Sequence, residues 1–213
     1  QPRKSFMYIP RAFNEDDLST LHQQIEGTRL GILVTHGARG LLANHIPLLL
    51  SPEQGPYGTL HGHLAKANPQ WQEMESGTEA LLIFPGPDAY VSPSFYPSKA
   101  EHGQAVPTWN YLAVHAYGPA EVFHDAHRLR DLVRALTEKH EAGRAKPWTL
   151  EDAPADYIDK MLGAIVGFAV PISRLEGKRK LTQNRNAPDI AGVRDGLAAS
   201  SAPNDNEIAR LMR

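Results

Sequence analysis

The chain has 213 residues, which is enough for one compact domain with a sizeable core. Hydrophobic residues make up 41% and charged residues 22%, values that argue against a disordered chain, a collagen-like repeat or a coiled-coil rod. The formal net charge of -2 provides no global field to attract nucleic acid or anionic lipid. The absence of cysteine excludes disulfides, thiolate metal sites and a thiol nucleophile.

The longest apolar runs fall far short of the about 20 residues that a membrane helix needs. Residues 1–6 contain a basic pair but no apolar region or cleavage site, so they are not typical of a secretory signal. Whether residues 1–6 belong to the native protein stays open. The cysteine-free composition fits a reducing compartment, and we expect a cytoplasmic protein without a membrane helix.

The first predicted helix begins at Asn14 as N-cap, carries Leu18, Leu21 and Ile25 at helical spacing, and ends at Gly27. Short β-type runs with glycine and proline between them follow. They cover Gly31–His36, Leu41–Leu49, Gly58–Ala65, Glu79–Phe84, Ala89–Ser92 and Thr108–Phe123. A hairpin at Gly37–Gly40 and the even spacing indicate an antiparallel sheet that closes toward a barrel.

The second half of the chain begins with two predicted helices, over residues 126–140 and 155–162. An apolar run at Ile165–Ile172 follows, and its Pro171 favours an edge strand or a bulge. Two short helical patterns end the chain, and the last has Asn204 and Glu207 as its capping pair. We therefore expect an α+β domain over residues 7–200 and a helical tail over 201–213.

The first candidate site is the pair His61 and His63 on a predicted strand, where alternation places both imidazoles on one face. His45 and His115 could complete a metal site, because imidazole binds zinc, iron and nickel. The expected carboxylate is missing and Lys66 follows instead, so two hydrogen-bonded surface histidines explain the pattern equally well.

The second candidate is the stretch from Pro85 to Tyr111, which is rich in proline and aromatic residues. Hydroxyl, amide and cationic side chains lie between the aromatic residues, a composition that suits a planar, anionic ligand such as flavin mononucleotide (FMN). A stiff loop with its aromatic residues packed on the core is the alternative, and composition alone favours it.

The third candidate is the basic cluster from Lys178 to Arg185, which holds four cations and no carboxylate. It could bind a phosphate or nucleic acid, with amide contacts from Gln183 and Asn184, or it could be a solvated surface. The chain has no G-x-G-x-x-G, no Walker loop and no G-x-S-x-G motif, which argues against Rossmann, P-loop and serine-hydrolase classes.

Together these motifs resemble the PaiB family, described as FMN-binding negative transcriptional regulators. The resemblance runs from Met7 to about Leu197. It rests on the segments 7–10, 58–71, 86–93, 109–111 and 178–185, which read MYIP, GTLHGHLAKANPQW, GPDAYVSP, WNY and KRKLTQNR.

The resemblance implies a fold, a cofactor and an assembly. The fold would be a six-stranded antiparallel split β-barrel of the pyridoxamine-phosphate-oxidase type, with peripheral helices and a helical C-terminus. FMN would bind between the subunits of a homodimer. By position in the motifs, the expected cofactor-binding residues are His61, Gly62, His63, Lys66, Asn68, Ser98, Lys99, Trp109, Asn110, Gln183 and Arg185, the last pair from the second subunit.

Three functional hypotheses follow. The leading one is an FMN-binding transcriptional regulator that acts through flavin occupancy, redox state or a partner. Direct DNA contact is not supported by the charge pattern, because no basic recognition helix is evident. The alternatives are an FMN-dependent oxidoreductase with an unidentified substrate and a histidine-based metal or haem protein. No catalytic residue can be assigned, so whether the protein is an enzyme stays open.

Overall fold

The computed structural model describes residues 7–212, so the question about residues 1–6 lies outside the described residues. The chain divides into two compact units. Of the described residues, the terminal unit comprises 7–21, 85–114 and 176–212. The central unit comprises residues 22–84 and 115–175.

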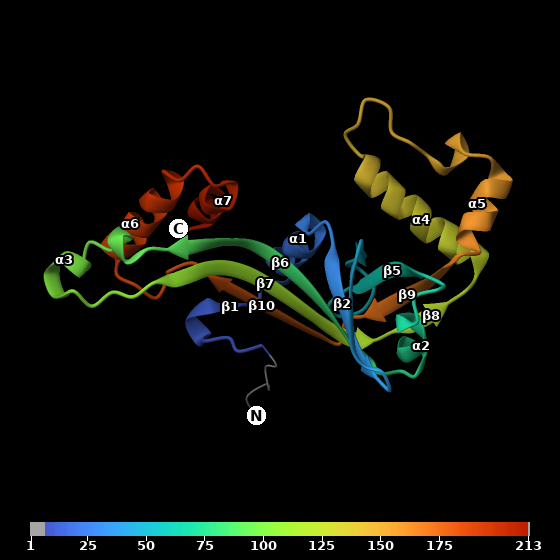
Figure 1. Cartoon of the computed structure of the whole chain (residues 1–213), viewed down its shortest axis with the longest axis horizontal. Coiled ribbons are helices and arrows are strands. Elements are labelled where there is room, and N and C mark those ends of the chain that lie inside the picture. Colours follow the sequence, from blue (N-terminus) through green and yellow to red (C-terminus); the bar gives the residue numbers. More distant parts are fainter. Residues whose placement is uncertain (1–6, 213) are drawn as a thin grey trace. The chain divides into compact units, whose positions relative to one another are not determined.

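Two sheets contain the strands of the described chain (Figure 1). The six-stranded antiparallel sheet has the order β1-β10-β7-β6-β2-β3. Its strands are β1 (Asn14–Glu15), β10 (Arg174–Lys180), β7 (Thr108–Pro119), β6 (Glu79–Val91), β2 (Gly31–Gly37) and β3 (Gly40–Ile46). Gly40, with φ at 86°, makes the tight β2–β3 turn possible, because glycine adopts positive φ without a steric penalty. No helix in the described residues is long and apolar enough to cross a membrane.

The second sheet belongs to the central unit and has the order β4-β5-β9-β8. Its strands are β4 (Leu49–Ser51), β5 (Thr59–Ala65), β9 (Ile165–Pro171) and β8 (Glu121–Phe123). Helices α4 (Ala126–Glu141) and α5 (Ala155–Leu162), joined through the short turn η3 (Leu150–Asp152), pack on one face of this sheet (Figure 1). The contact is made by apolar residues one helical turn apart, such as Leu129, Leu132 and Leu136, which pack with Phe123 and Ala169.

Two further helices, α1 (Leu18–Gly27) and α2 (Gln70–Glu75), lie between strands in the chain. Helix α2 is fixed by the fully buried Gln70, whose amide donates to Leu33 O and Leu42 O, each at 3.2 Å. The Gln70 carbonyl oxygen accepts a hydrogen bond from Asn44 at 2.7 Å. Because both ends of this buried amide are satisfied, Gln70 can hold α2 against the β2–β3 hairpin at little desolvation cost.

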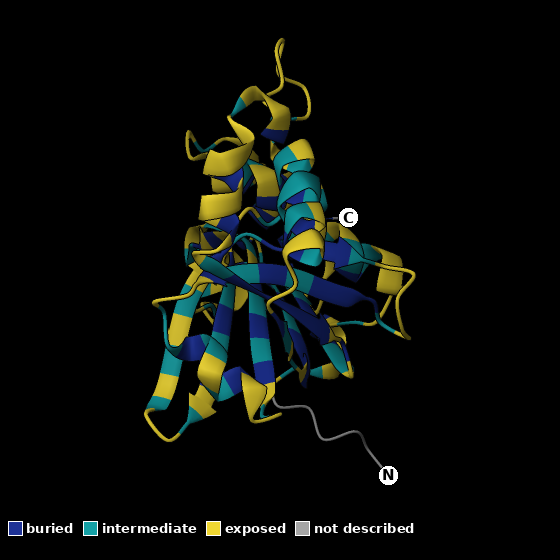
Figure 2. Cartoon of the chain, turned by 90° about the vertical axis from the view of Figure 1, so that its right-hand side faces the viewer, coloured by how far each residue is buried: buried dark blue, intermediate teal, exposed yellow. Residues whose placement is uncertain are grey.

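The terminal unit contains the remaining helices, which are η1 (Arg11–Phe13), η2 (Pro93–Phe95), α3 (Lys99–His102), α6 (Ala187–Ala198) and α7 (Pro203–Leu211). Helices α6 and α7 share one apolar cluster with the end of β6, in which Val91, Val193 and Ile208 are fully buried. Figure 2 shows the general pattern of the fold, with buried residues on the strands and exposed residues on the outer faces of the helices.

The structure confirms the expected α+β class and corrects several predicted bounds. Asn14 lies in β1, and Asp17 caps α1 instead by accepting the Thr20 N–H at 2.8 Å. The run 41–49 is interrupted at Pro47, whereas the runs 79–84 and 89–92 form one strand. Strand β9 pairs with both β5 and β8 and is not an edge strand, but β8 pairs only with residues 167–169, so Pro171 lies beyond that ladder and pairs with β5 alone. Asn204 does not cap α7, which begins after Ala202. The boundary between residues 200 and 201 stays a prediction.

Candidate functional site

Strand β5 places His61 and His63 on one face, as the alternation of side chains predicts. Both are half-buried, while Leu60 and Leu64 on the opposite face are buried. Gly62 also points to the buried face, where a Cβ would lie 2.6 Å from the Phe168 ring. Gly62 is therefore required for packing and could contribute only its backbone to a ligand.

His61 lies in register with residues of the neighbouring strands. Its register partner is Ala169, which in turn pairs with Glu121 on β8. Glu121 forms a salt bridge with Arg128 at the start of α4, and the His61 imidazole contacts Gln54 Oε1 at 3.1 Å. Burial lowers the pKa of His61, and Arg128 lowers it further, against the opposing effect of Glu121. His61 is therefore predominantly neutral at physiological pH.

His63 carries an unsatisfied polar atom. Its Nδ1 is buried and has no hydrogen-bond partner among residues 7–212. Burial lowers the pKa of His63, so the neutral ring is favoured. A buried nitrogen without a partner is uncommon in folded proteins and is typical of a position that a ligand or ordered water completes.

Lys66 and Asn68 follow β5 directly. The Lys66 ammonium is exposed, and within residues 7–212 it donates to a single carbonyl oxygen, that of Gly163, at 3.4 Å. Its backbone is fixed more firmly, since Lys66 N donates to Ala164 O at 2.8 Å and Lys66 O accepts from Trp71 at 3.0 Å. Asn68 accepts the Gln70 N–H at 3.0 Å and so caps α2. The structure thus leaves the Lys66 ammonium available for an anion, while the Asn68 carbonyl oxygen already has a partner.

The other expected site residues lie in the terminal unit. The Ser98 hydroxyl and backbone N–H donate to Asp189 at 2.8 Å and 3.1 Å, so Ser98 is used within the protein. Burial alone would raise the pKa of Asp189, but hydrogen bonds from Ser98 and the charge of Arg185 hold it below its ordinary value. A carboxylate at this position opposes a phosphate. Lys99 is exposed at the start of α3.

Trp109 and Asn110 are neighbours on β7 with opposite environments. Trp109 is 52% exposed and its ring contacts that of Tyr90 edge-to-face at 5.7 Å. Asn110 is fully buried, and its amide donates to Thr182 Oγ1 at 2.9 Å and to Met212 Sδ at 3.8 Å. Of these two residues, Trp109 alone presents a free face to a ligand.

The turn after β10 contains Thr182, Gln183 and Arg185. Thr182 has a φ of 65°, which is strained for a β-branched residue. The Gln183 side chain bonds its own turn, accepting from Leu181 N at 2.7 Å and donating to Arg179 O. Arg185 is exposed, with its guanidinium 5.3 Å from the Tyr96 ring centre. The turn is thus held from within, and Arg185 lies at its exposed surface against the Tyr96 ring.

Sequence reasoning missed two features near these residues. Gln70 was not recognised as a buried anchor, because nothing in its local pattern separates it from an exposed glutamine. Lys178 and Lys180 belong to a strand that was not predicted, although their spacing of two residues was a signal that both lie on one face. Lys178 is only 7% exposed.

The histidine-based metal hypothesis gains no support from the geometry. Within the described residues, no group of three histidine, aspartate or glutamate side chains is arranged to hold a metal ion. His45 is exposed on β3, a strand of the other sheet. The roles proposed for the individual site residues stay predictions.

The chain matches a known protein family. A family described as "Putative FMN-binding domain" matches residues 7–174. The protein from Bacillus subtilis (strain 168) named "Protease synthase and sporulation protein PAI 2" is 32% identical over 206 residues, covering 97% of this chain and 96% of that protein. This relative confirms the resemblance to the PaiB family.

Two solved structures are similar in fold. The flavocytochrome Anf3 from Azotobacter vinelandii has a TM-score of 0.59 at 15% identity, covering 85% of this chain and 74% of that chain. The FAD and haem binding protein from Mycobacterium smegmatis has a TM-score of 0.59 at 17% identity, covering 84% of this chain and 78% of that chain. At this identity the likeness concerns the fold alone, and it confirms the expected split-barrel architecture.

Proposed function

Because the chain belongs to the FMN-binding domain family that matches residues 7–174, we propose that it is a transcriptional regulator of the PaiB type whose output depends on bound FMN. The cofactor of the family is FMN. The regulatory role is supported by the full-length similarity to the PAI 2 protein, whose name refers to protease synthesis and sporulation. We propose a cytoplasmic homodimer in which both subunits contribute to each flavin site.

Residues of β5 and of the turn after it fit this cofactor. His63 offers a buried nitrogen without a partner in the described chain, and Lys66 offers an exposed ammonium whose one hydrogen bond in the described chain is a long contact with a carbonyl oxygen. A flavin needs directional partners for its polar edge and a cation for its phosphate. We assign His63 to a hydrogen bond with the ligand and Lys66 to phosphate neutralisation. The partnerless His63 nitrogen is the observation that carries this assignment.

The bound flavin would supply electron transfer, and the residues of this chain would set its environment. The neutral imidazoles of His61 and His63 add no positive charge at physiological pH, so the main cation in residues 59–68 is Lys66. Arg128 is held by Glu121 and is not free to replace it. Trp109, with its exposed ring, is assigned to cover the flavin ring, and Arg185 to the contribution from the second subunit.

An FMN titration of the purified protein tests the binding assignment. We expect a flavin absorption spectrum with one FMN per chain, and Lys66→Ala should weaken FMN binding about tenfold or more, because a charge-assisted hydrogen bond is lost. Lys146→Ala, which changes an exposed lysine of the α4–η3 loop, is the control. Equal affinity for the Lys66→Ala variant and the wild type would exclude the phosphate role.

The regulatory assignment needs a separate test in cells. Transcript levels are compared between a strain with the wild-type gene, a deletion strain and a strain carrying Lys66→Ala. We expect a set of transcripts to rise in the deletion strain and to rise equally with the FMN-deficient variant. Transcripts that are unchanged by the deletion would contradict the regulatory role, and transcripts restored by Lys66→Ala would contradict its dependence on FMN.

A further inference from the structure

One face of β10 carries charges at alternate positions. Glu176, Lys178 and Lys180 share this face, and Tyr111 of β7 lies beside it, because the Lys178 ammonium is 5.0 Å from the centre of its ring. Arg179 points to the opposite face, where it pairs with Glu15. The face therefore holds two cations against one carboxylate, all within the terminal unit.

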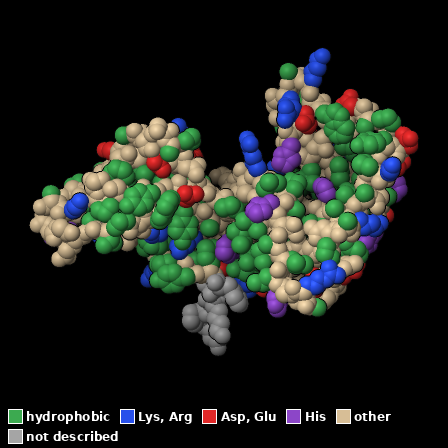
Figure 3. Space-filling view, in the orientation of Figure 1, with side chains coloured by type: hydrophobic (Ala, Val, Ile, Leu, Met, Phe, Trp, Pro, Cys, Tyr) green, Lys and Arg blue, Asp and Glu red, His purple; other side chains and the backbone are tan. Residues whose placement is uncertain are grey.

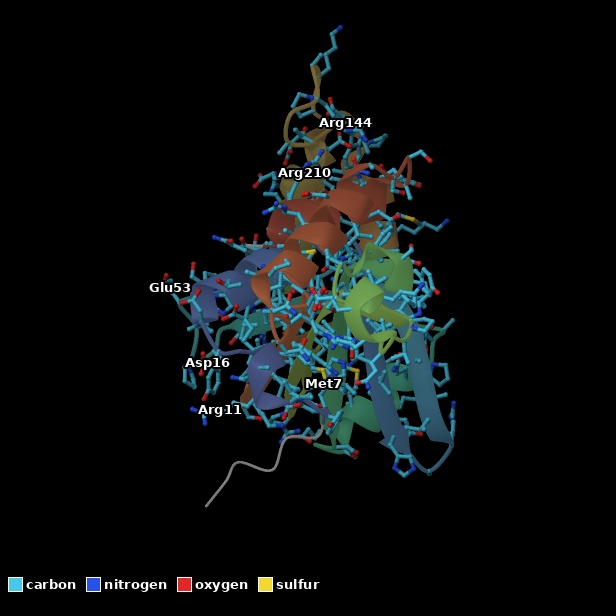
Figure 4. The ribbon with its side chains drawn as sticks, turned by 90° about the vertical axis from the view of Figure 1, so that its left-hand side faces the viewer. Met7, Arg11, Asp16, Glu53, Arg144 and Arg210 are labelled. Carbon is cyan, nitrogen blue, oxygen red and sulfur yellow. The ribbon has the colours of Figure 1, made fainter. Side chains whose placement is uncertain are left out.

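Lys178 is buried, and no carboxylate of the described residues forms an ion pair with it. Its ammonium donates to the backbone carbonyl of Tyr8 at 3.0 Å and lies 5.6 Å from the centre of the Tyr8 ring. A neutral carbonyl and two aromatic faces solvate the cation but leave its charge uncompensated. The carboxylate on this face, Glu176, accepts the backbone N–H of Met7 at 3.0 Å. Figure 4 labels Met7, where the described chain begins.

Lys180 extends the same cationic surface. Its ammonium donates to Thr108 Oγ1 and to Trp109 O at 2.6 Å, again without an ion pair in the described chain. Burial lowers the pKa of Lys180, and the neighbouring charge of Lys178 lowers it further. Two like charges kept side by side are costly unless an anion offsets them.

Exposed aromatic rings border these lysines. Tyr8 is 83% exposed and Trp109 is 52% exposed, and Tyr90 adds a third ring against Trp109. Figure 3 shows hydrophobic side chains together with Lys and Arg side chains over the strands of this unit. Large aromatic side chains exposed next to buried cations are typical of binding surfaces.

We propose that Lys178 and Lys180, with Tyr8 and Tyr111, form a binding site for an aromatic ligand that carries a phosphate. The lysines neutralise the phosphate, and the tyrosine rings contact the flat part of the ligand. These residues are distinct from Lys66, to which phosphate neutralisation was assigned above.

Two ligands have this chemistry. One is a free nucleotide. The other is an FMN molecule that is also bound by the partner subunit, and in that case the inference rests on the proposed function. The two cases differ in whether replacing the lysines weakens the binding of a nucleotide or the binding of FMN.

Calorimetric titration of the full chain with AMP, adenosine, FMN and riboflavin tests the site. For a nucleotide site, we expect AMP to bind in the presence of saturating FMN, adenosine to bind at least tenfold more weakly, and Lys178→Met and Lys180→Met each to weaken AMP binding about tenfold. For an FMN site, the same variants weaken FMN binding about tenfold, leave riboflavin binding unchanged, and AMP competes with FMN.

Lys160→Met, at an exposed lysine of α5, is the matched control and should leave every affinity unchanged. Because Lys178 is buried, its variant is checked by circular dichroism, and the less buried Lys180 carries the test if the Lys178 variant unfolds. Unchanged affinities for both AMP and FMN in a folded Lys180→Met protein would overturn the proposal. A wild-type protein that binds AMP but not FMN would contradict the proposed function and leave this site standing.

Discussion

At the residue scale, the two histidines of β5 show how a single strand gives similar side chains different surroundings. His61 has Gln54 as a partner and is influenced by charges on β8 and α4. His63, two residues later, has a buried nitrogen with no partner in the described chain. The same alternation that placed both on one face also placed His63 next to Gly167, over which the Phe123 ring lies.

The lowered pKa of His63 predicts how stability depends on pH. The folded protein holds His63 neutral, whereas the unfolded chain protonates it near the ordinary value of 6.5. The unfolded state therefore binds more protons below that pH, and the unfolding free energy should decrease as the pH falls from 7.5 to 5.5. The variant His63→Gln should lose less stability over this range in urea titrations.

The control for this experiment is His36→Gln, which changes an exposed histidine of β2. We expect this variant to follow the wild-type pH dependence. A His63→Gln protein whose unfolding free energy falls as steeply as that of the wild type would contradict the role of His63 burial. FMN is omitted from all samples, so that ligand binding does not contribute to the slope.

At the element scale, the turn between β10 and α6 joins segments far apart in the sequence. Asn110 on β7 is paired with Thr182 by two hydrogen bonds, of 2.9 Å and 3.1 Å, and with Met212 beyond α7. Thr182 keeps its positive φ because this buried pair holds it, since an isolated β-branched residue would leave that conformation. The pair thus orients the turn that presents Arg185.

Replacing Asn110 with alanine should destabilise the protein by about 2–3 kcal/mol, because the Thr182 hydroxyl loses its buried partner and a cavity forms. Urea unfolding monitored by circular dichroism measures this change. Asn184→Ala, in the same turn but exposed, should stay within about 0.5 kcal/mol of the wild type. Equal stability of the two variants would show that the Asn110–Thr182 pair does not hold the turn.

The sequence was sufficient for elements whose signal is local and insufficient for those that depend on partners. Helix α5 has the predicted bounds, and α4 ends one residue beyond its predicted end, because their apolar spacing and the Asp125 cap are local signals. Strand β10 was missed because its alternating charges look like a solvated surface until Tyr111 and Tyr8 cover them. In the candidate site, the common face of His61 and His63 was predictable, but the pairing of Ser98 with Asp189, 91 positions away, was not.

At the scale of the whole molecule, the expected site residues are divided between the two units. The β5 residues belong to the central unit, and Trp109 and Arg185 belong to the terminal unit. Strands β6 and β7 each run from one unit into the other, so the units are connected by continuous backbone. Because both units share these strands, a ligand that binds only the native protein should stabilise the two units together by mass action.

FMN should therefore stabilise the whole chain rather than one unit. At a concentration of FMN one hundred times its Kd, we expect the unfolding free energy to increase by about 2.7 kcal/mol. For a chain of this size that corresponds to an increase in Tm of about 5–10 °C, with riboflavin giving less because it lacks the phosphate.

Far-ultraviolet circular dichroism follows all elements, and the fluorescence of a variant that keeps Trp109 alone among the tryptophans follows the terminal unit. Equal shifts in both signals are the expected result. A shift in circular dichroism without one in Trp109 fluorescence would mean that FMN is held by the central unit alone, and would contradict the assignment of Trp109 and Arg185 to its site.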